Sequence, residues 1–150
     1  MATNLTQILD DIAALSVSDG ATTPPVYYGA TIRNSWEKAN LPIRVLQPVN
    51  FGVNSAKSQT LRPTFAMTVV WTIQDILLLR PAGMGKGLPD ITVNLTDYLS
   101  NYIDAVRSLG SSYYTRQNVR GTVEMLEYPA ASGRFYDSVV ITLDFLDIIQ

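Results

Sequence analysis

Alternation of apolar and polar side chains in two segments constrains the fold of this chain more than any other feature. From residue 65 to 74 every second side chain is large and apolar, and the same period returns from residue 135 to 145. Successive side chains of a β-strand point to opposite faces. The period therefore predicts two long strands, each with one face turned to a core. The first is expected to continue through residues 76–79.

The second long strand is expected to be the returning half of a hairpin. Its partner covers about residues 118–128, and residues 128–133, which contain proline and glycine, form the turn. Alternation over residues 26–32 predicts a further short strand.

Another strand is expected over residues 41–48, where Pro42 and Pro48 bracket an apolar run. Because proline cannot donate to a ladder, this strand is expected to be short or to lie at an edge. Residues 51–63 are polar and lack a period, and they are interpreted as a mobile loop or as the extension of a hairpin. Residues 80–89 are interpreted as a loop rich in glycine and proline.

Two segments have the period of an amphipathic helix. Apolar residues recur at three- and four-residue spacing over residues 4–16 and again over residues 90–109. Asn4 and Gln7 are a candidate N-cap pair for the first helix. Gly110 suits the position after the end of the second.

This order of elements predicts an α+β fold with a mainly antiparallel sheet of four to five strands and both helices packed on one face. A chain of 150 residues has the length of one ordinary domain, so residues 1–150 are interpreted as a single domain. No stretch approaches the length of apolar chain that spans a membrane, and residues 1–15 lack the basic start of a secretory signal.

The composition argues against most catalytic and metal chemistry. The chain has no Cys and no His, so thiol nucleophiles, the usual general base near neutral pH and the usual zinc ligand sets are missing. Charged residues make up only 16% of the chain, against about a quarter in typical proteins. This shortage of charge indicates that partners cover part of the surface. We therefore expect a protein that assembles with other chains, without catalytic residues, cofactor or metal.

The motifs that resemble chemical sites are weak. The glycine-rich run at residues 83–87 lacks the Ser or Thr of a phosphate loop and is interpreted as a connection. Asp97 and Asp104 lie two turns apart and are expected on a solvated helix face. The acidic residues of the closing hairpin are unusual in strands and are interpreted either as a face toward a channel or a neighbouring chain, or as scattered surface charges. They are Glu124, Glu127, Asp137, Asp144 and Asp147.

Two tryptophans are candidate anchors, because Trp is enriched at interface hot spots. Trp71 is in phase with apolar neighbours and is expected in the core. Trp36 stands in a polar context and is the better interface candidate. The eleven basic residues are scattered singly, so a surface that tracks phosphates is not expected.

As a whole, the order of elements resembles the tail terminator proteins of long-tailed bacteriophages. It runs from the opening helix through a strand at residues 41–48, a long strand at 64–74 and a helix at 89–110 to the hairpin at 118–149. Nearly the whole chain is covered, and the resemblance rests on element order and length. It implies a homo-hexameric ring that caps the tail tube and joins the tail to the head in the virion, after assembly in the host cytoplasm.

The resemblance also implies the partners. They are further copies of this chain, the tail tube protein and a head-side neck or stopper protein, while DNA passes through the channel without sequence-specific binding and no membrane is contacted. The two polar loops are natural docking arms, because loops on a rigid sheet often carry contacts. The candidate partner-contact residues are Trp36, Lys57, Arg62, Arg80, Lys86 and Arg134.

Other readings remain open. Head-closure (stopper) proteins and tail tube subunits are also small α/β or β-rich proteins, so a neighbouring neck role is one alternative. A small-ligand-binding α+β domain or an enzyme is the alternative of a different class, because a sheet with one helical face often encloses a pocket.

Overall fold

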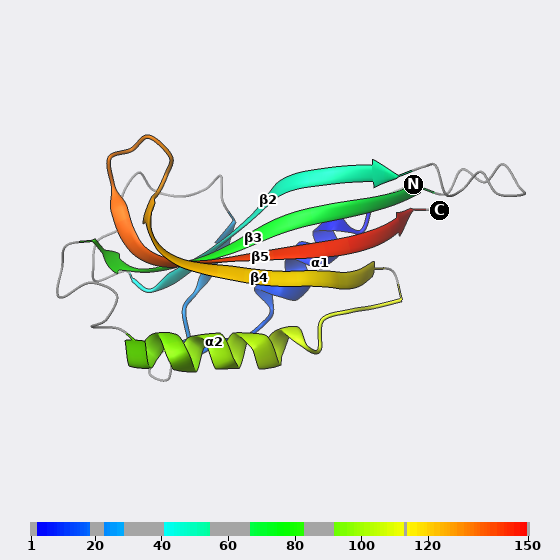
Figure 1. Cartoon of the computed structure of the whole chain (residues 1–150). Coiled ribbons are helices and arrows are strands. Elements are labelled where there is room, and N and C mark those ends of the chain that lie inside the picture. Colours follow the sequence, from blue (N-terminus) through cyan, green and yellow to red (C-terminus); the bar gives the residue numbers. More distant parts are fainter. Residues whose placement is uncertain are drawn as a thin grey trace, which may run out of the picture.

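The computed structural model describes residues 3–18, 23–28, 41–54, 67–82, 92–112 and 114–149. Two helices and five strands follow one another in these parts of the chain (Figure 1). They are α1 (Leu5–Ala13), β1 (Val26–Tyr28), β2 (Ile43–Asn54), β3 (Met67–Pro81), α2 (Thr92–Val106), β4 (Tyr114–Glu127) and β5 (Phe135–Ile149).

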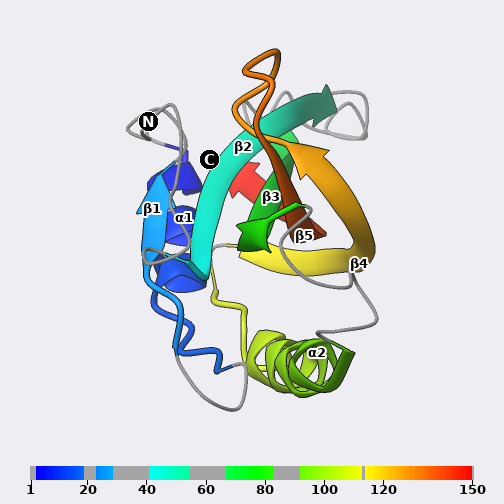
Figure 2. The ribbon, with the colours of Figure 1, turned by 90° about the vertical axis from the view of Figure 1, so that its left-hand side faces the viewer.

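All five strands belong to one sheet, in the order β1-β2-β3-β5-β4. β1 pairs with β2 in parallel, and the other three neighbouring pairs are antiparallel. Figure 2 shows the sheet strongly curved, with both helices on the same side of it. The prediction of an α+β fold with a mainly antiparallel sheet and two helices on one face is confirmed.

The two alternating segments become β3 and β5, which pair along nearly their whole length at the centre of the sheet. Ile73 lies opposite Leu143, and Leu77 lies opposite Val139. All four side chains are fully buried on the face that carries the helices. Burial of such a side chain contributes about 1.5–3 kcal/mol, so this apolar row explains why the two segments pair in this register.

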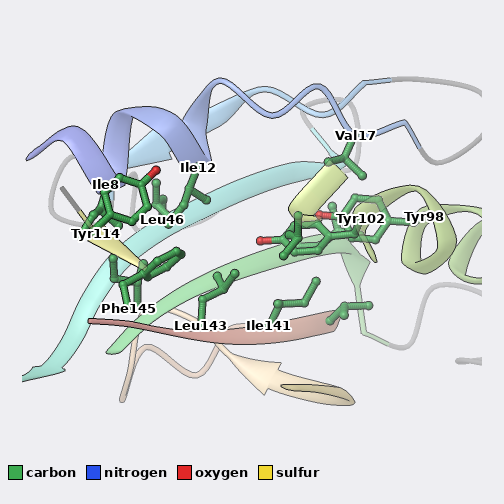
Figure 3. Close-up of a cluster of buried hydrophobic side chains, with 14 of the residues drawn as sticks. Ile8, Ile12, Val17, Leu46, Tyr98, Tyr102, Tyr114, Ile141, Leu143 and Phe145 are labelled. Carbon is green, nitrogen blue, oxygen red and sulfur yellow. The ribbon is translucent and has the colours of Figure 1, made fainter. Parts of the chain in front are cut away.

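Both helices supply the other half of this core. Ile8 and Ile12 of α1 point toward the sheet, as do Tyr98 and Tyr102 of α2 (Figure 3). These four side chains are at most 1% exposed. The amphipathic pattern of each helix therefore predicted the buried face correctly.

A smaller apolar cluster lies on the opposite face of the sheet. Ile76 and Leu78 of β3 meet β2 and β5 residues there, and Tyr128, directly after β4, packs against the same group. The hairpin formed by β4 and β5 curls away from the plane of the other strands (Figure 1). This second cluster consists of Ile43, Val45, Ile76, Leu78, Tyr128, Tyr136 and Val140.

The length predicted for the strand at residues 41–48 is wrong. β2 continues to Asn54 and pairs there with β3, so residues 51–54 extend a hairpin, which is one of the two interpretations given for residues 51–63. Only Arg44 to Leu46 pair with β1, and Pro48 lies beyond that pairing. The missing N–H of proline is thus placed where no strand of the described part of the chain lies on the outer side of β2.

Several other predictions lie outside the described residues, among them most of the strand at 26–32, the loop at 55–63 and the glycine-rich run at 83–87. Within the residues that the structure describes, neither helix has the length and apolar character needed to cross a bilayer.

Candidate interaction surface

Of the six candidate partner-contact residues, two lie in the described part of the chain. Trp36, Lys57, Arg62 and Lys86 fall outside it. The other two candidates are Arg80 and Arg134.

Arg80 lies near the end of β3 and is paired inside the domain. Its Nε donates to Asp137 Oδ2 at 2.9 Å, and the two side chains are only 14% and 7% exposed. This pair does not test whether Arg80 contacts a partner, so that assignment stays a prediction. Arg134 is exposed beside the turn between β4 and β5, and its position leaves the prediction for it standing without testing it.

Asp147 ties the start of α1 to the sheet. The backbone N–H of Asn4 donates to Asp147 Oδ2 at 2.9 Å, and the Asn4 side-chain amide donates to Oδ1 at 2.7 Å. Trp71 Nε1 donates to Oδ2 at 3.1 Å. Asn4 stands at the predicted cap position, but its side chain makes no capping hydrogen bond to the helix. The predicted pair with Gln7 is wrong, since Gln7 donates to Asp11 instead.

Each of the other acidic residues of β5 also has its own hydrogen-bond partners. Asp144 accepts from Thr72 and from Arg120, each at 2.8 Å. Burial acts to raise the pKa of Asp144, but these hydrogen bonds and the Arg120 charge outweigh it and lower the pKa. Asp137 and Asp147 are in phase with the core residues of β5, whereas Asp144 points to the other face. The hypothesis of one acidic face along the last strand is therefore wrong.

On the partner strand, Glu124 is exposed and Glu127 accepts from the backbone N–H of Gly133 in the turn. Asp97 and Asp104 are exposed on α2, as predicted for a solvated helix face. No group of three or more acidic, His or Cys side chains in the described ranges is arranged to hold a metal ion.

A buried charged cluster joins the sheet to both helices. Arg44 of β2 forms an ion pair with Asp75 of β3, and Tyr102 of α2 donates its hydroxyl to Asp75 Oδ2 at 2.8 Å. Burial alone acts to lower the pKa of Arg44, but the Asp75 carboxylate outweighs it and raises the pKa. Burial also raises the pKa of the Tyr98 and Tyr102 hydroxyls, so both stay protonated. The arrangement holds elements together and presents no group to solvent.

The carboxyl ends of both helices are capped by arginines that come from strands. Arg44 donates to the carbonyl oxygens of Ile12 and Leu15 after α1, at 3.2 and 2.7 Å. Arg116 of β4 donates to the carbonyl of Val106, the last residue of α2. Neither helix has a basic residue of its own in the last turn. The carbonyls of Ile12 and Val106 also accept from the backbone N–H groups of Leu15 and Leu109. The arginines therefore add a positive charge at the negative end of each helix, which is favourable.

A shallow cavity of about 310 Å³ lies between the ends of the two helices. Tyr114, the first residue of β4, donates its hydroxyl to Asp11 at its wall. Burial, and then the hydrogen bond and charge of Asp11, raise the pKa of Tyr114, so the phenol remains a neutral donor. The lining consists of Asp11, Ala14, Leu15, Ser108, Leu109, Gly110 and Tyr114.

Within the described residues, β4 is an extended exposed strand. All residues from 117 to 125 are exposed, although they form a regular strand. On the helix-bearing face, β4 carries Val119, Val123 and Met125, which are 39–61% exposed. The alternation of residues 119–125 was visible in the sequence, but nothing in it revealed that this strand would stand at the border of the sheet.

Neither the models of known protein families nor the curated proteins match this sequence.

Proposed function

We propose that this chain is a structural protein of a phage neck, a tail terminator that forms a homo-hexameric ring on the end of the tail tube and joins the tail to the head. The observation that carries the proposal is the order of elements around one curved sheet. The order is a helix, three strands, a second helix and a closing hairpin, and this order is the feature on which the resemblance to tail terminators rests. The exposed border strand β4 supports assembly with other chains.

The exposed border strand β4 also supports two other roles in the neck. A head-closure protein or a tail tube subunit also works by assembly, and an open strand edge suits each of them. The partners in the terminator reading are the tail tube protein on one side of the ring and a head-side neck protein on the other.

The first test is the genetic neighbourhood of the coding sequence, where genes for a portal, a capsid and a tail tube protein are expected. The direct test adds the purified chain to isolated tail tubes that lack a terminator. Electron microscopy is then expected to show a closed ring at one end of each tube, and light scattering a hexameric mass for the released ring. Tubes that remain bare and continue to elongate in the presence of the folded chain contradict the proposal.

A ligand-binding function is the second candidate, and the cavity between the helix ends favours it. Its volume of about 310 Å³ lies at the lower end of the range of small-molecule pockets, roughly 300–1,000 Å³. Asp11 and Tyr114 offer a carboxylate and a phenol to a ligand. A thermal-shift screen of small cations and polar metabolites tests it, with Asp11→Asn as the matched variant. A ligand that stabilises the chain but not the variant supports binding, and a screen without any stabilising compound contradicts it.

A further inference from the structure

The strand β4 has one side without a partner in the described part of the chain. It is the last strand in the sheet order, and its ladder to β5 runs from Tyr114 to Glu127. An edge strand of this length presents a row of backbone donors and acceptors that can pair with another chain. The side chains on such an edge decide which partner fits.

The two faces of β4 differ in character. On the helix-bearing face lie Val119, Val123 and Met125, because they are in phase with Leu143 and Val139 of the main core. Gly121 stands between them on the same face, opposite Ile141.

On the other face lie Arg120, Thr122 and Glu124, opposite Thr142, Val140 and Ser138. Arg120 keeps 59% of its side chain exposed although it donates to Asp144, and Glu124 is exposed as well. A cation and a carboxylate thus stand at equal distances on either side of Thr122.

We propose that β4 pairs with β4 of a second copy of this chain, antiparallel and centred on Thr122, so that one continuous sheet crosses the dimer. In this register Arg120 of each copy faces Glu124 of the other, which gives two opposite-charge pairs. On the helix-bearing face, Val119 faces Met125 and Gly121 faces Val123. Opposite charges and apolar side chains directly across two strands stabilise their pairing.

The charges of Arg120 and Glu124 favour a second copy of this chain as the partner and favour an antiparallel pairing. A two-fold contact brings each residue against its mirror position, so Arg120 and Glu124 satisfy one another only when the partner strand is identical. A parallel pairing of the same strands places like charges side by side, which is destabilising. A shift that centres the pairing on Gly121 sets each charged residue against a neutral one, since Arg120 then faces Thr122.

The dimer does not rest on the proposed function. A two-fold contact closes on itself, so it cannot by itself build a ring in which all copies face the same way. The dimer is therefore a separate species, one that covers an exposed edge of the free chain. A hexameric ring without this dimer, or this dimer without any ring, separates the two proposals.

Charge reversal provides the first test. Arg120→Glu and Glu124→Arg each turn both charge pairs into like-charge pairs, and each is expected to weaken the dimer about ten-fold or more, measured by sedimentation equilibrium. An equal mixture of the two variants restores an attractive pair at both positions. We expect the mixture to form a heterodimer about as stable as the original dimer, identified by mass with one variant carrying a tag.

The matched control is Arg107→Glu, which changes the charge by the same amount as Arg120→Glu at an exposed position outside β4. It is expected to leave the dimer intact. Circular dichroism and melting of each variant verify its fold, because Arg120→Glu also removes the contact with Asp144 inside the chain. A monomeric unmodified chain, or variants that dimerise as well as the original, or a mixture that fails to recover, each overturns the proposal.

A cysteine test is independent of these charges, since the chain contains no Cys. In the proposed register, Thr122 of the two copies lie directly opposite one another, with Cβ atoms about 4.5–5.5 Å apart. Thr122→Cys is expected to form a disulfide-linked dimer on oxidation with diamide. The exposed Thr115→Cys on the same strand lies away from the centre and is expected to stay monomeric under denaturing electrophoresis. Equal cross-linking of both variants, or of neither, contradicts the register.

Discussion

The guanidinium of Arg44 donates to both oxygens of the Asp75 carboxylate, with Nε 3.2 Å from Oδ1 and Nη2 2.5 Å from Oδ2. The two side chains are 1% and 0% exposed. The guanidinium also donates to the carbonyls of Ile12 and Leu15 at the end of α1 and lies over the ring of Tyr102. Asp75 also accepts from the Tyr102 hydroxyl of α2. One ion pair thereby joins two strands and both helices at the centre of the domain.

Breaking this pair should be among the most damaging single changes in the chain. Arg44→Met leaves the Asp75 carboxylate buried without its cation, which costs about 3–5 kcal/mol of unfolding free energy. Urea denaturation followed by circular dichroism measures the loss.

The double variant Arg44→Met/Asp75→Leu removes both charges and is the informative comparison. It is expected to be more stable than Arg44→Met, because no charge remains buried alone. Equal or lower stability of the double variant would show that the pair is not the source of the loss.

The second prediction concerns Asp147. Asp147→Ala leaves the Asn4 donors and the Trp71 indole N–H without their acceptor. These donors are part-buried, so each should cost less than the about 1–3 kcal/mol of a fully buried donor left unsatisfied. We expect a lower urea midpoint together with a change in tryptophan fluorescence. Asn4→Ala is the matched variant, since it removes the amide contact but keeps the contact to Trp71. It should lower stability less and leave the fluorescence near that of the original chain.

The spacing of apolar residues in the sequence was sufficient to predict the layers of the fold. The alternation around Ile73 and Leu143 predicted both central strands and the faces that they bury, because an apolar row has a low free energy only against a core. The helix that holds Tyr98 and Tyr102 was predicted for the same reason. What a period of two or of 3.6 cannot report is which strand stands next to which, so the exposed position of β4 was not predicted.

The polar residues were harder to interpret, although part of the signal was present. Asp137 and Asp147 are in phase with the apolar residues of β5, and Arg44 is in phase with Leu46. A charged residue at an inward position must find a partner, because an unpaired buried charge is costly. The phase of these charged residues indicated that they face inward. Their hydrogen-bonding partners come from distant segments, which the phase does not report. Asp75 belongs to another strand, and Asn4 lies 143 residues from Asp147.

The third prediction is an alkaline limit to stability. The pKa values of Tyr98, Tyr102 and Tyr114 are raised in the folded chain, first of all by burial. In the unfolded chain these phenols ionise near pH 10, so above that pH the unfolded state binds fewer protons than the folded state. Stability is therefore fully present below about pH 10 and falls as the pH rises further.

Phenolate absorbance at alkaline pH checks this. The phenolate signal of Tyr98, Tyr102 and Tyr114 should rise only when circular dichroism reports unfolding. Tyr114→Phe should reduce the phenolate absorbance that appears on unfolding, and it should reduce the loss of stability at alkaline pH. Simultaneous ionisation of all tyrosines near pH 10 in a chain that remains folded contradicts the prediction.

The fourth prediction concerns acid. The folded pKa of Asp144 lies below its ordinary value of 3.8, because hydrogen bonds from Arg120 and Thr72 outweigh the effect of burial. Its contribution to stability is therefore present above about pH 4 and is lost as the pH falls through the lower, folded pKa. Asp144→Asn removes that contribution at neutral pH, so the variant should be less stable at pH 7 and should lose less stability between pH 5 and pH 2. Asp104→Asn, an exposed carboxylate whose nearest cation is 3.8 Å away, is the matched change and should leave the acid profile of the original chain in place. Urea midpoints across this pH range measure both variants, and an Asp144→Asn profile parallel to that of the original chain would show that the lowered pKa does not stabilise the fold.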